Sequence, residues 1–373
     1  MKNIEIVRKK FPVTESKVFL NHSAYSPLPQ PVVDIMKKYN EDLCRFEIDE
    51  TKYSLGQEFF AKLIDSEKNE IALVQNTSTG LNIVANMLEY PRKSNIVTTD
   101  LEYPSVVYPW LKKSLGVEVR YVKNVDGKIL VEDVEKAVDD KTVAVAISHV
   151  GYVNGFKHDL KMLAEIAHSH GAFLVVDAIQ SLGAIPVDVQ RDDVDFLTAS
   201  CYKWLLGPAG AGYLYVRPEL IQKLEPPFLG WASVKPEVFE TVEFWDIWRL
   251  QLSETASRFE VGSPSFISFV GAAAAIQLLL DVGIEDIQSR ILRLTDLLME
   301  SVENLGFQLT TPENKDNRSG IIHFLVDKAQ KMEERLQSRG IVISARSKGL
   351  RVAPHFYNTE EEIECLVREL KAS

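Results

Sequence analysis

The feature that most constrains the fold is a regular alternation of short β-rich runs with amphipathic stretches between residues 71 and 216. Helical patterns such as residues 160–170 separate the runs IALV, NIVTT, VEVRYV, TVAVAIS, AFLVVDA, DFLTAS and GYLYV. Strands that alternate with helices usually pair in parallel, because each connection crosses one face of the sheet. The pattern predicts an α/β fold in which helices cover both faces of a mostly parallel sheet.

The chain is too long for one minimal core. It has 373 residues, of which 46% are hydrophobic, and single cores stop growing at about 250–300 residues. We predict a large domain over residues 15–255 and a smaller α+β domain over residues 256–373 that also takes in residues 1–14. The smaller domain should contain a long helix after Gly262, the strands GIIHFLV and LRVAP, and a charged helix from Thr359. Residues 226–254, rich in aromatics and proline, should form an irregular excursion.

Composition and charge exclude several classes of function. The formal net charge is -11, with acidic and basic residues interspersed, which argues against a nucleic-acid or anionic-membrane partner. The first residues carry charge where a signal peptide needs an apolar stretch, and the apolar run at residues 269–280 has only the length of a buried helix. We therefore expect a cytoplasmic protein.

The cysteines and histidines do not form the pattern of a metal site. Cys44, Cys201 and Cys365 are widely spaced and contain no CxxC pair, and His168 and His170 have no HExxH motif or carboxylate cluster around them. We predict no disulfide framework and no bound metal.

Two strand-and-turn units carry the strongest chemical signal. The apolar run LVVDA ends in Asp177, and open α/β sheets bind ligands at the carboxyl ends of strands. Lys203 lies just beyond the next strand, in DFLTASCYKW. A desolvated lysine amine attacks aldehydes readily, and a carboxylate beside a pyridine nitrogen keeps that nitrogen protonated. Singly the two residues fit a surface lysine and a helix cap; together they predict a pyridoxal phosphate (PLP) site.

A phosphate group needs hydroxyls and backbone N–H groups at the start of a helix. The run NTSTG at residues 76–80 lies between IALV and the helical pattern LNIVANML. The same residues would also make a plain helix cap, which is a common feature. With a PLP site nearby, we predict that Ser78 and Thr79 contact the cofactor phosphate.

These residues belong to a series of segments that resembles a known family. The segments are, in chain order, FLNHSAYSPLP, QNTSTGLNIVA, LEYPSVVYPW, SHVGYVNG, VVDAIQSLG, SCYKWLLGPAGAG, RFEVGSPS and LRVAPHFYNTEEEI. They are similar to the class V aminotransferase or cysteine-desulfurase-like branch of the fold type I PLP-dependent enzymes, which also holds kynureninases and isopenicillin N epimerase-like proteins. The resemblance covers nearly the whole chain and implies PLP as cofactor, amino acids and 2-oxo acids as substrates, and a homodimer with shared active sites.

The resemblance implies a role for each matching position. Lys203 would be the Schiff-base lysine, Asp177 the partner of the ring nitrogen, and Gln180 the partner of the ring hydroxyl. Tyr103 would stack on the ring, where desulfurases have a histidine; an aromatic ring covers a pyridine face equally well. The phosphate would be bound by Ser78, Thr79, Ser200 and Tyr202 and, across the dimer interface, by Ser263.

The substrate residues follow from the same resemblance. Arg351 would bind the substrate carboxylate, for which its planar fork is suited. Asn21 and His22 match a loop that lines the substrate mouth. In SHVGYVNG, either Tyr152 or Asn154 would face the cofactor, and the sequence leaves this choice open.

The chain departs from the desulfurases at their nucleophilic cysteine. That thiolate lies on a loop shortly before the substrate arginine, and residues 336–350 contain no cysteine. We read Cys365 as a core residue of the terminal helix and Cys44 likewise as a core residue of a helix, and Cys201 lies beside Lys203 rather than on the loop. Desulfuration through a persulfide is therefore not expected.

The predicted activity is chemistry at the α-carbon of an amino acid. In the first hypothesis, Lys203 holds PLP, releases it to an incoming amine, and then acts as base and acid at the α-carbon, so that the amino group passes to a 2-oxo acid. The alternatives are a C–S lyase or desulfurase-like reaction, epimerisation, and a non-catalytic binding protein of the same fold. A nicotinamide dehydrogenase is disfavoured because no GxGxxG motif follows the first strands.

Overall fold

A seven-stranded sheet forms the centre of the molecule. The computed structural model, which describes residues 4–47, 51–235 and 248–372, confirms every predicted strand of this sheet. The strands are, in sheet order, β2 (Ile71–Val74), β8 (Gly212–Val216), β7 (Phe196–Ser200), β6 (Phe173–Asp177), β5 (Thr142–Ser148), β3 (Asn95–Thr99) and β4 (Glu118–Val122). Strand β8 is antiparallel to both neighbours, and the other pairs are parallel.

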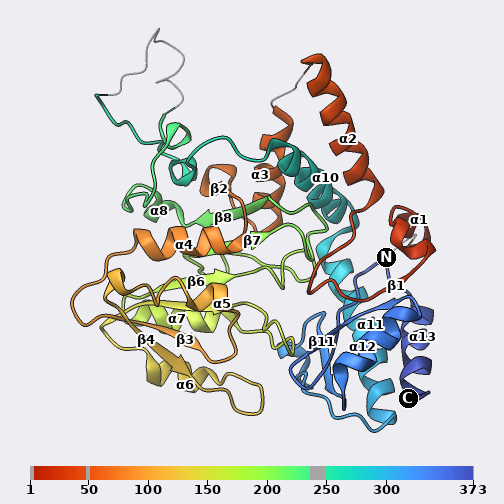
Figure 1. Ribbon diagram of the computed structural model, residues 1–373. Helices are drawn as coiled ribbons and strands as arrows, with labels where there is room; N and C mark the ends of the chain where they lie inside the picture. The colour runs from red at the N-terminus through yellow and green to blue at the C-terminus, as the bar shows by residue number, and fades with distance from the viewer. Residues whose placement is uncertain (1–3, 48–50, 236–247, 373) are drawn as a thin grey trace.

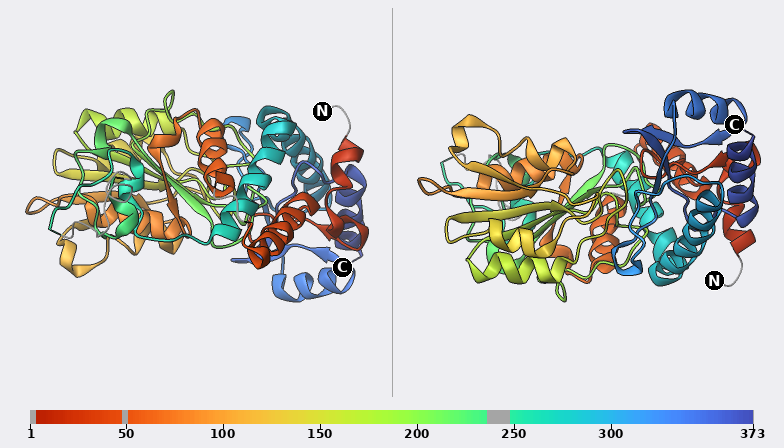
Figure 2. Two further views of the ribbon diagram at one scale, coloured as in Figure 1. Left: turned by 90° about the horizontal axis from the view of Figure 1, so that it is seen from above. Right: turned by 90° about the horizontal axis from the view of Figure 1, so that it is seen from below.

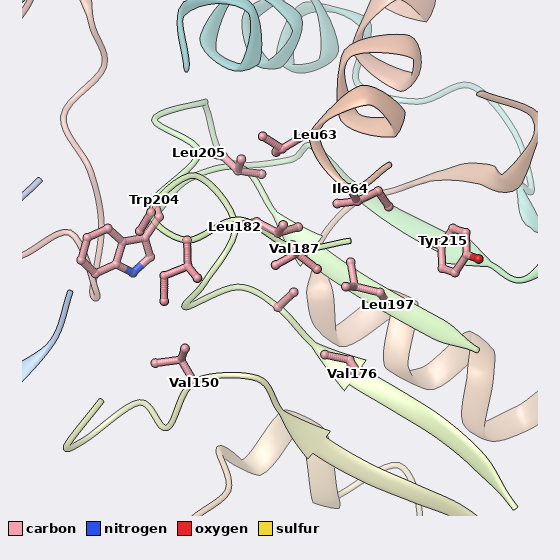
Figure 3. Packing of buried hydrophobic residues seen from close by; sticks show 14 of the residues in the cluster. Leu63, Ile64, Val150, Val176, Leu182, Val187, Leu197, Trp204, Leu205 and Tyr215 are labelled. Carbon is pink, nitrogen blue, oxygen red and sulfur yellow. The ribbon is translucent and has the colours of Figure 1, made fainter. Parts of the chain in front are cut away.

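Helices cover both faces of this sheet because its strands are apolar on both sides. In β6, Leu174 and Val176 belong to one hydrophobic cluster, whereas Val175 belongs to the cluster on the opposite face. Figure 3 shows part of the first cluster, where Val176, Leu197 and Tyr215 of three neighbouring strands lie along one side of the sheet. The first face packs against α3 (Thr51–Leu63), α6 (Val131–Ala137) and α7 (Leu160–Ser169), and the second against α4 (Thr77–Met87), α5 (Pro104–Val107) and α8 (Pro218–Ile221).

A long buried helix follows the sheet in the chain. The helix α10 (Phe266–Val282) contains the predicted apolar run and lies against α2 (Gln30–Arg45) and α3 (Figure 1). It ends at Gly283, whose φ of 91° lies in the region that favours glycine. There the chain bends by 79° into α11 (Ile284–Asn304). In the described ranges, no single helix is long and apolar enough to cross a membrane.

The C-terminal part has a smaller core of its own. A three-stranded antiparallel sheet, in the order β11 (Ser344–Arg346), β12 (Gly349–Val352) and β9 (Ile322–Leu325), packs with α12 (Ala329–Ser338) and α13 (Glu360–Lys371). The buried residues of this cluster are Leu20 from the N-terminal segment and residues from Leu294 onward. The preceding helix α10 packs instead into the cluster of the large sheet. The division of the chain at residue 256 stays a prediction.

The N-terminal segment returns to this C-terminal part. Strand β1 (Val18–Phe19) pairs in parallel with β10 (Ile341–Val342), and Arg8 of α1 (Ile4–Arg8) binds Glu362 with an N–O distance of 2.6 Å. In both views of Figure 2 the two chain ends lie at the same end of the molecule. Segments far apart in the sequence therefore complete one unit.

Residues 226–254 are irregular in the part that the structure describes, as predicted. They contain a short 3-10 helix (Trp231–Ser233) and an isolated bridge between Val234 and Leu252. Residues 236–247 of this segment lie outside the described residues. The described part exposes several large apolar side chains, namely Phe228, Leu229, Trp231, Trp248 and Leu250.

Candidate active site

A cavity of ≈ 410 Å³ opens at the carboxyl ends of β6 and β7. Most of the residues that line it have polar side chains; they are Gln75, Asn76, Thr77, Ser78, Tyr103, Ser105, Asp177, Ile179, Ser200, Tyr202, Lys203, Ala209 and Gly210. The predicted site residues in this wall are Ser78, Tyr103, Asp177, Ser200, Tyr202 and Lys203. As described, the wall does not include Thr79, Tyr152, Gln180, Ser263, His22 or Arg351.

Lys203 carries its amine into this cavity from a tight turn. The turn closes with a hydrogen bond from the Leu206 N–H to the Lys203 carbonyl, and Leu206 has a φ of 58°. The amine lies 5.8 Å from the ring centroid of Tyr103 and 5.9 Å from that of Tyr202. Burial lowers the pKa of Lys203 to about 8, and the negative charge of Asp177 opposes this shift. The amine is therefore much closer to neutrality at pH 7 than an ordinary lysine.

Asp177 is the last residue of β6 and is buried. Its Oδ1 accepts a hydrogen bond from the Ile179 N–H at 2.9 Å. Burial raises the pKa of Asp177 to about 6, and the positive charge of Lys203 limits the rise. Within the described ranges, no protein donor bonds its second carboxylate oxygen. That oxygen can accept a hydrogen bond from a ligand in the cavity.

The start of α4 forms a polar cradle in the cavity wall. Asn76 caps the helix by accepting the Thr79 N–H at 2.9 Å. The Thr77 N–H donates to Ser200 Oγ at 2.7 Å, and the Ser200 N–H donates to Thr77 Oγ1 at 2.9 Å. This reciprocal pair fixes the helix start to the end of β7. Ser78 Oγ lies 2.7 Å from Ser105 Oγ at the start of α5, so two hydroxyls meet where the positive end of the helix dipole points.

A chain of contacts connects the cavity to Arg351. The rings of Tyr103 and Tyr152 lie 5.3 Å apart at 78°, and Arg351 Nη1 donates to the Tyr152 carbonyl at 2.6 Å. Arg351 Nε donates to Ser344 Oγ at 3.3 Å. Burial, aided by the positive charge of Arg346, lowers the pKa of Arg351 to about 9, so the guanidinium stays protonated at neutral pH. It lies close enough for its charge to lower the pKa of Lys203.

The family of the chain follows from its similarity to known proteins. A model of the family described as "Aminotransferase class-V" matches residues 18–368. The chain belongs to the class V aminotransferase family. The match confirms the resemblance predicted from the sequence, together with fold type I and PLP as the cofactor.

Similar members of this family have names of two kinds. The Bacillus subtilis (strain 168) protein named "Uncharacterized aminotransferase YcbU" is 32% identical over 374 residues, 99% of this chain and 97% of that protein. A "Probable cysteine desulfurase" from Pyrococcus abyssi is 31% identical over 405 residues, 99% of each chain. The apo structure of a cysteine desulfurase from Thermococcus onnurineus NA1 has a TM-score of 0.91 and 28% identity, and covers 100% of this chain and 98% of that one.

The cavity fits the class V cofactor. An amine with a lowered pKa is available for its aldehyde, and a buried carboxylate with one free oxygen is available for its ring nitrogen. Hydroxyls and N–H groups at the start of α4 suit its phosphate. Lys203, Asp177, Ser78 and Ser200 are therefore the residues that would hold PLP.

Gln180 and Thr79 lie behind the cavity wall rather than in it. The Gln180 amide donates to the Ser23 carbonyl at 2.9 Å and accepts from Trp204 Nε1 at 2.9 Å. The Thr79 hydroxyl donates to Asn76 Oδ1 at 3.1 Å. Both side chains thus stabilise the elements that form the wall, and their assignment as direct cofactor ligands stays a prediction.

The surroundings of His22 argue against its predicted contact with the substrate, which stays untested. It is fully buried, and its Nδ1 and Nε2 lie 2.8 Å from the Ala353 carbonyl and 2.7 Å from the Tyr357 hydroxyl. Burial holds the pKa of His22 well below its ordinary value. Because both ring nitrogens are already bonded, the geometry argues against a direct substrate contact and gives this ring a structural role.

The partners of Tyr152 and Asn154 favour Tyr152 as the residue that faces the cofactor. The Asn154 amide donates to the Gly127 carbonyl at 2.6 Å, and its oxygen accepts the Phe156 N–H at 3.2 Å. Tyr152 instead packs against Tyr103, the ring at the cavity. Tyr152 is thus the residue of this loop nearer the cofactor site.

Besides lining residues such as Gln75 and Ile179, three residues in or near the site were not singled out from the sequence. Ser105 lines the cavity, and Glu102 accepts hydrogen bonds from the Ser148 N–H at 3.0 Å and Ser148 Oγ at 2.5 Å. Burial raises the pKa of Glu102 to about 7, with a smaller contribution from Asp177. Both lie in the segment EYPS after β3, where a strand end followed by a proline-initiated helix is a usable signal. The third, Arg346, had no such signal.

Proposed function

We propose that the protein is a PLP-dependent aminotransferase that moves an amino group from an amino acid to a 2-oxo acid. The observation that supports this most directly is the convergence of Lys203, Asp177 and the start of α4 on one cavity, with Arg351 beside it. Bound there, PLP supplies an aldehyde for the substrate amine and an electron-withdrawing ring. These are the requirements of chemistry at an amino-acid α-carbon.

The residues of this chain divide the remaining work. The Arg351 guanidinium binds the substrate carboxylate and orients the α-carbon. Lys203 Nζ, once free, takes the proton from the α-carbon and returns it at a different atom of the substrate–cofactor pair. The Asp177 carboxylate keeps the ring nitrogen protonated. Tyr103, at the mouth, covers the ring and limits the access of water.

The cysteines argue against the persulfide reaction of the desulfurases. Cys201 is fully buried, and burial raises the pKa of its thiol, so it is a poor nucleophile. Cys44 lies on α2 and is exposed, so the prediction that it is a core residue was wrong, whereas Cys365 on α13 is half-buried against the C-terminal cluster. The hairpin before Arg351, formed by β11 and β12, contains no cysteine. A thiolate that could receive sulfur from the substrate is missing from this hairpin.

A C–S lyase is the second candidate, because relatives of this chain have desulfurase names. Elimination of a sulfur group, followed by hydrolysis of the remaining enamine, releases sulfide, ammonia and a 2-oxo acid and needs no cysteine nucleophile. It uses the same proton removal by Lys203. The two candidates therefore differ in the fate of the substrate rather than in the residues of the cavity.

Spectra of the holoenzyme test this proposal. An amino acid alone should convert the bound cofactor to its amine form, and a 2-oxo acid should restore the aldehyde form, in repeated cycles. Lys203→Ala should lose the absorbance band of the lysine-bound cofactor and roughly 10²–10⁴-fold in rate, while Lys161→Ala, an exposed control on α7, should lose neither. Release of sulfide and pyruvate from cysteine without the amine form would support the lyase, and a Lys203→Ala variant that kept the band would refute the assignment of the lysine.

We also propose a homodimer in which Ser263 reaches the phosphate site of the partner subunit. Ser263 is exposed and precedes α10, outside the cavity wall of its own chain as described. A phosphate contact by Ser263 thus requires a second copy.

A further inference from the structure

A hairpin beside the site presents two arginines on one face. In the pair formed by β11 and β12, Ser344 lies opposite Arg351, and Arg346 lies opposite Gly349. Residues two apart on a strand, and residues directly opposite across a pair, point to the same side of the sheet. Arg346 and Arg351 therefore share the face on which Arg351 bonds Ser344.

The two arginines are diagonal neighbours. Diagonal positions of an antiparallel pair lie about 7–8 Å apart, within the reach of long side chains. A small molecule that meets the guanidinium of Arg351 would therefore have a second guanidinium close to its other end. Gly349, opposite Arg346, has no side chain that could separate them.

Arg346 has no anionic partner in the described part of the chain. It is exposed, and its Nη1 donates to the Ala345 carbonyl at 2.8 Å. Its positive charge lowers the pKa of both Lys203 and Arg351, so the side chain acts on the site rather than on a distant surface. Three cations thus lie near this space, and the carboxylates that act on them are Asp177 in the cavity wall and Glu333, whose Oε2 accepts the Ala345 N–H at 3.0 Å.

We propose that Arg346 binds a second acidic group of the substrate, so that the enzyme prefers amino acids and 2-oxo acids with two carboxylates. This inference rests on the proposed function and specifies its substrate class. With Arg351 on the α-carboxylate, the ω-carboxylate of a four- or five-carbon substrate extends toward Arg346. Paired guanidinium–carboxylate contacts of this kind are short and directional.

The first test compares two substrates in single turnovers of the holoenzyme. Arg346→Gln should lower the second-order rate constant for aspartate and glutamate by roughly 10- to 100-fold, a range typical of a lost charge-assisted contact, and change that for alanine by less than about threefold. Lys348→Gln is the matched control. It removes a positive charge from the same hairpin, but Lys348 lines a different surface cavity. A wild-type preference for alanine, or an equal loss for both substrate classes, would overturn the proposal.

The second test measures binding without turnover. Succinate should bind the holoenzyme more tightly than butyrate by calorimetry, and Arg346→Gln should abolish the difference. Because neither ligand carries an amine, this result does not depend on amino-group transfer. If succinate binds through Arg346 but no amino acid yields the amine form, the proposed function fails and the dicarboxylate site stands. If amino acids react and succinate shows no advantage, only the dicarboxylate site fails.

Discussion

Lys203 lies between one negative and two positive charges, and this balance sets the pH at which its amine becomes neutral. Asp177 raises the pKa of Lys203, whereas Arg351 and Arg346 lower it after the larger effect of burial. Only the neutral amine attacks the cofactor aldehyde. The pKa of Lys203 can therefore be measured from the pH dependence of the rate at which the apoprotein binds added PLP.

The rate of reconstitution with PLP should rise with pH and level off above about 8, because the pKa of Lys203 is lowered to about 8. A pKa below the ordinary value means that the neutral amine already dominates where a surface lysine is still protonated. Stopped-flow absorbance over pH 6–10 measures the profile; an apparent pKa near the ordinary lysine value of about 10.4 would contradict the geometry.

Variants that remove a neighbouring charge should shift the midpoint of this pH profile in opposite directions. Asp177→Asn should move its midpoint to lower pH, and Arg346→Gln should move it to higher pH. Arg339→Gln removes an exposed arginine at the end of α12 and should leave the midpoint unchanged.

At the scale of elements, the start of α4 has two roles, helix capping and cofactor binding, which experiments can separate. Asn76 caps the helix, and its neighbours line the cavity. Asn76→Ala should destabilise the apoprotein by about 0.5–2 kcal/mol and should also weaken PLP binding, because the N–H groups of the first turn lose their fixed orientation. Thermal unfolding and equilibrium dialysis measure the two effects.

Thr359→Ala is the control for this prediction. Thr359 caps α13 through a capping box with Glu362, in the cluster of the C-terminal part. The variant should lose similar stability and leave the PLP dissociation constant unchanged. An equal loss of PLP affinity in both variants would mean that Asn76 acts through general stability alone.

The elements that the sequence predicts are those with enough residues to show a pattern. All seven strands of the large sheet were predicted, because each has four or more residues and is rich in β-branched, aromatic or other apolar side chains. Strands β1 and β10 have two residues each and β11 has three, too few for periodicity. These short strands hold the hairpin with Arg351, so that part of the site was placed by resemblance alone.

Within the site, prediction succeeded where a strand end dictates the position. Asp177 and Ser200 end β6 and β7, and sheet topology brings them together. Which hydroxyl of the first turn of α4 faces the cavity depends instead on how the helix is rotated. Thr79 turns back to Asn76, and Ser105 from another helix takes a place in the wall.

At the scale of the whole molecule, the proposed sharing of sites between two subunits predicts complementation. Hybrids that combine a Lys203→Ala subunit with a Ser263→Asp subunit should contain one intact site, because an aspartate repels phosphate only in the partner's cavity. Mixing the inactive or weakened homodimers should therefore restore activity. Sedimentation should give twice the mass of one chain.

In the control for this experiment, both subunits carry Lys203→Ala. Mixtures of Lys203→Ala with Lys203→Ala,Ser263→Asp subunits contain no intact lysine site and should stay inactive. If the first hybrid also stays inactive although subunit exchange is demonstrated by labelling, Ser263 does not act across the interface.

The parallel pairing of β1 with β10 constrains the order in which parts of the chain can fold during translation. Val18 is translated long before its partner Ile341. The carbonyl of Ala353, to which the His22 ring bonds, comes later still. The large sheet can form before that, because its last strand, β8, ends at Val216. The N-terminal segment must wait until residues 341–353 have been translated, and the surroundings of Arg351 are completed only then.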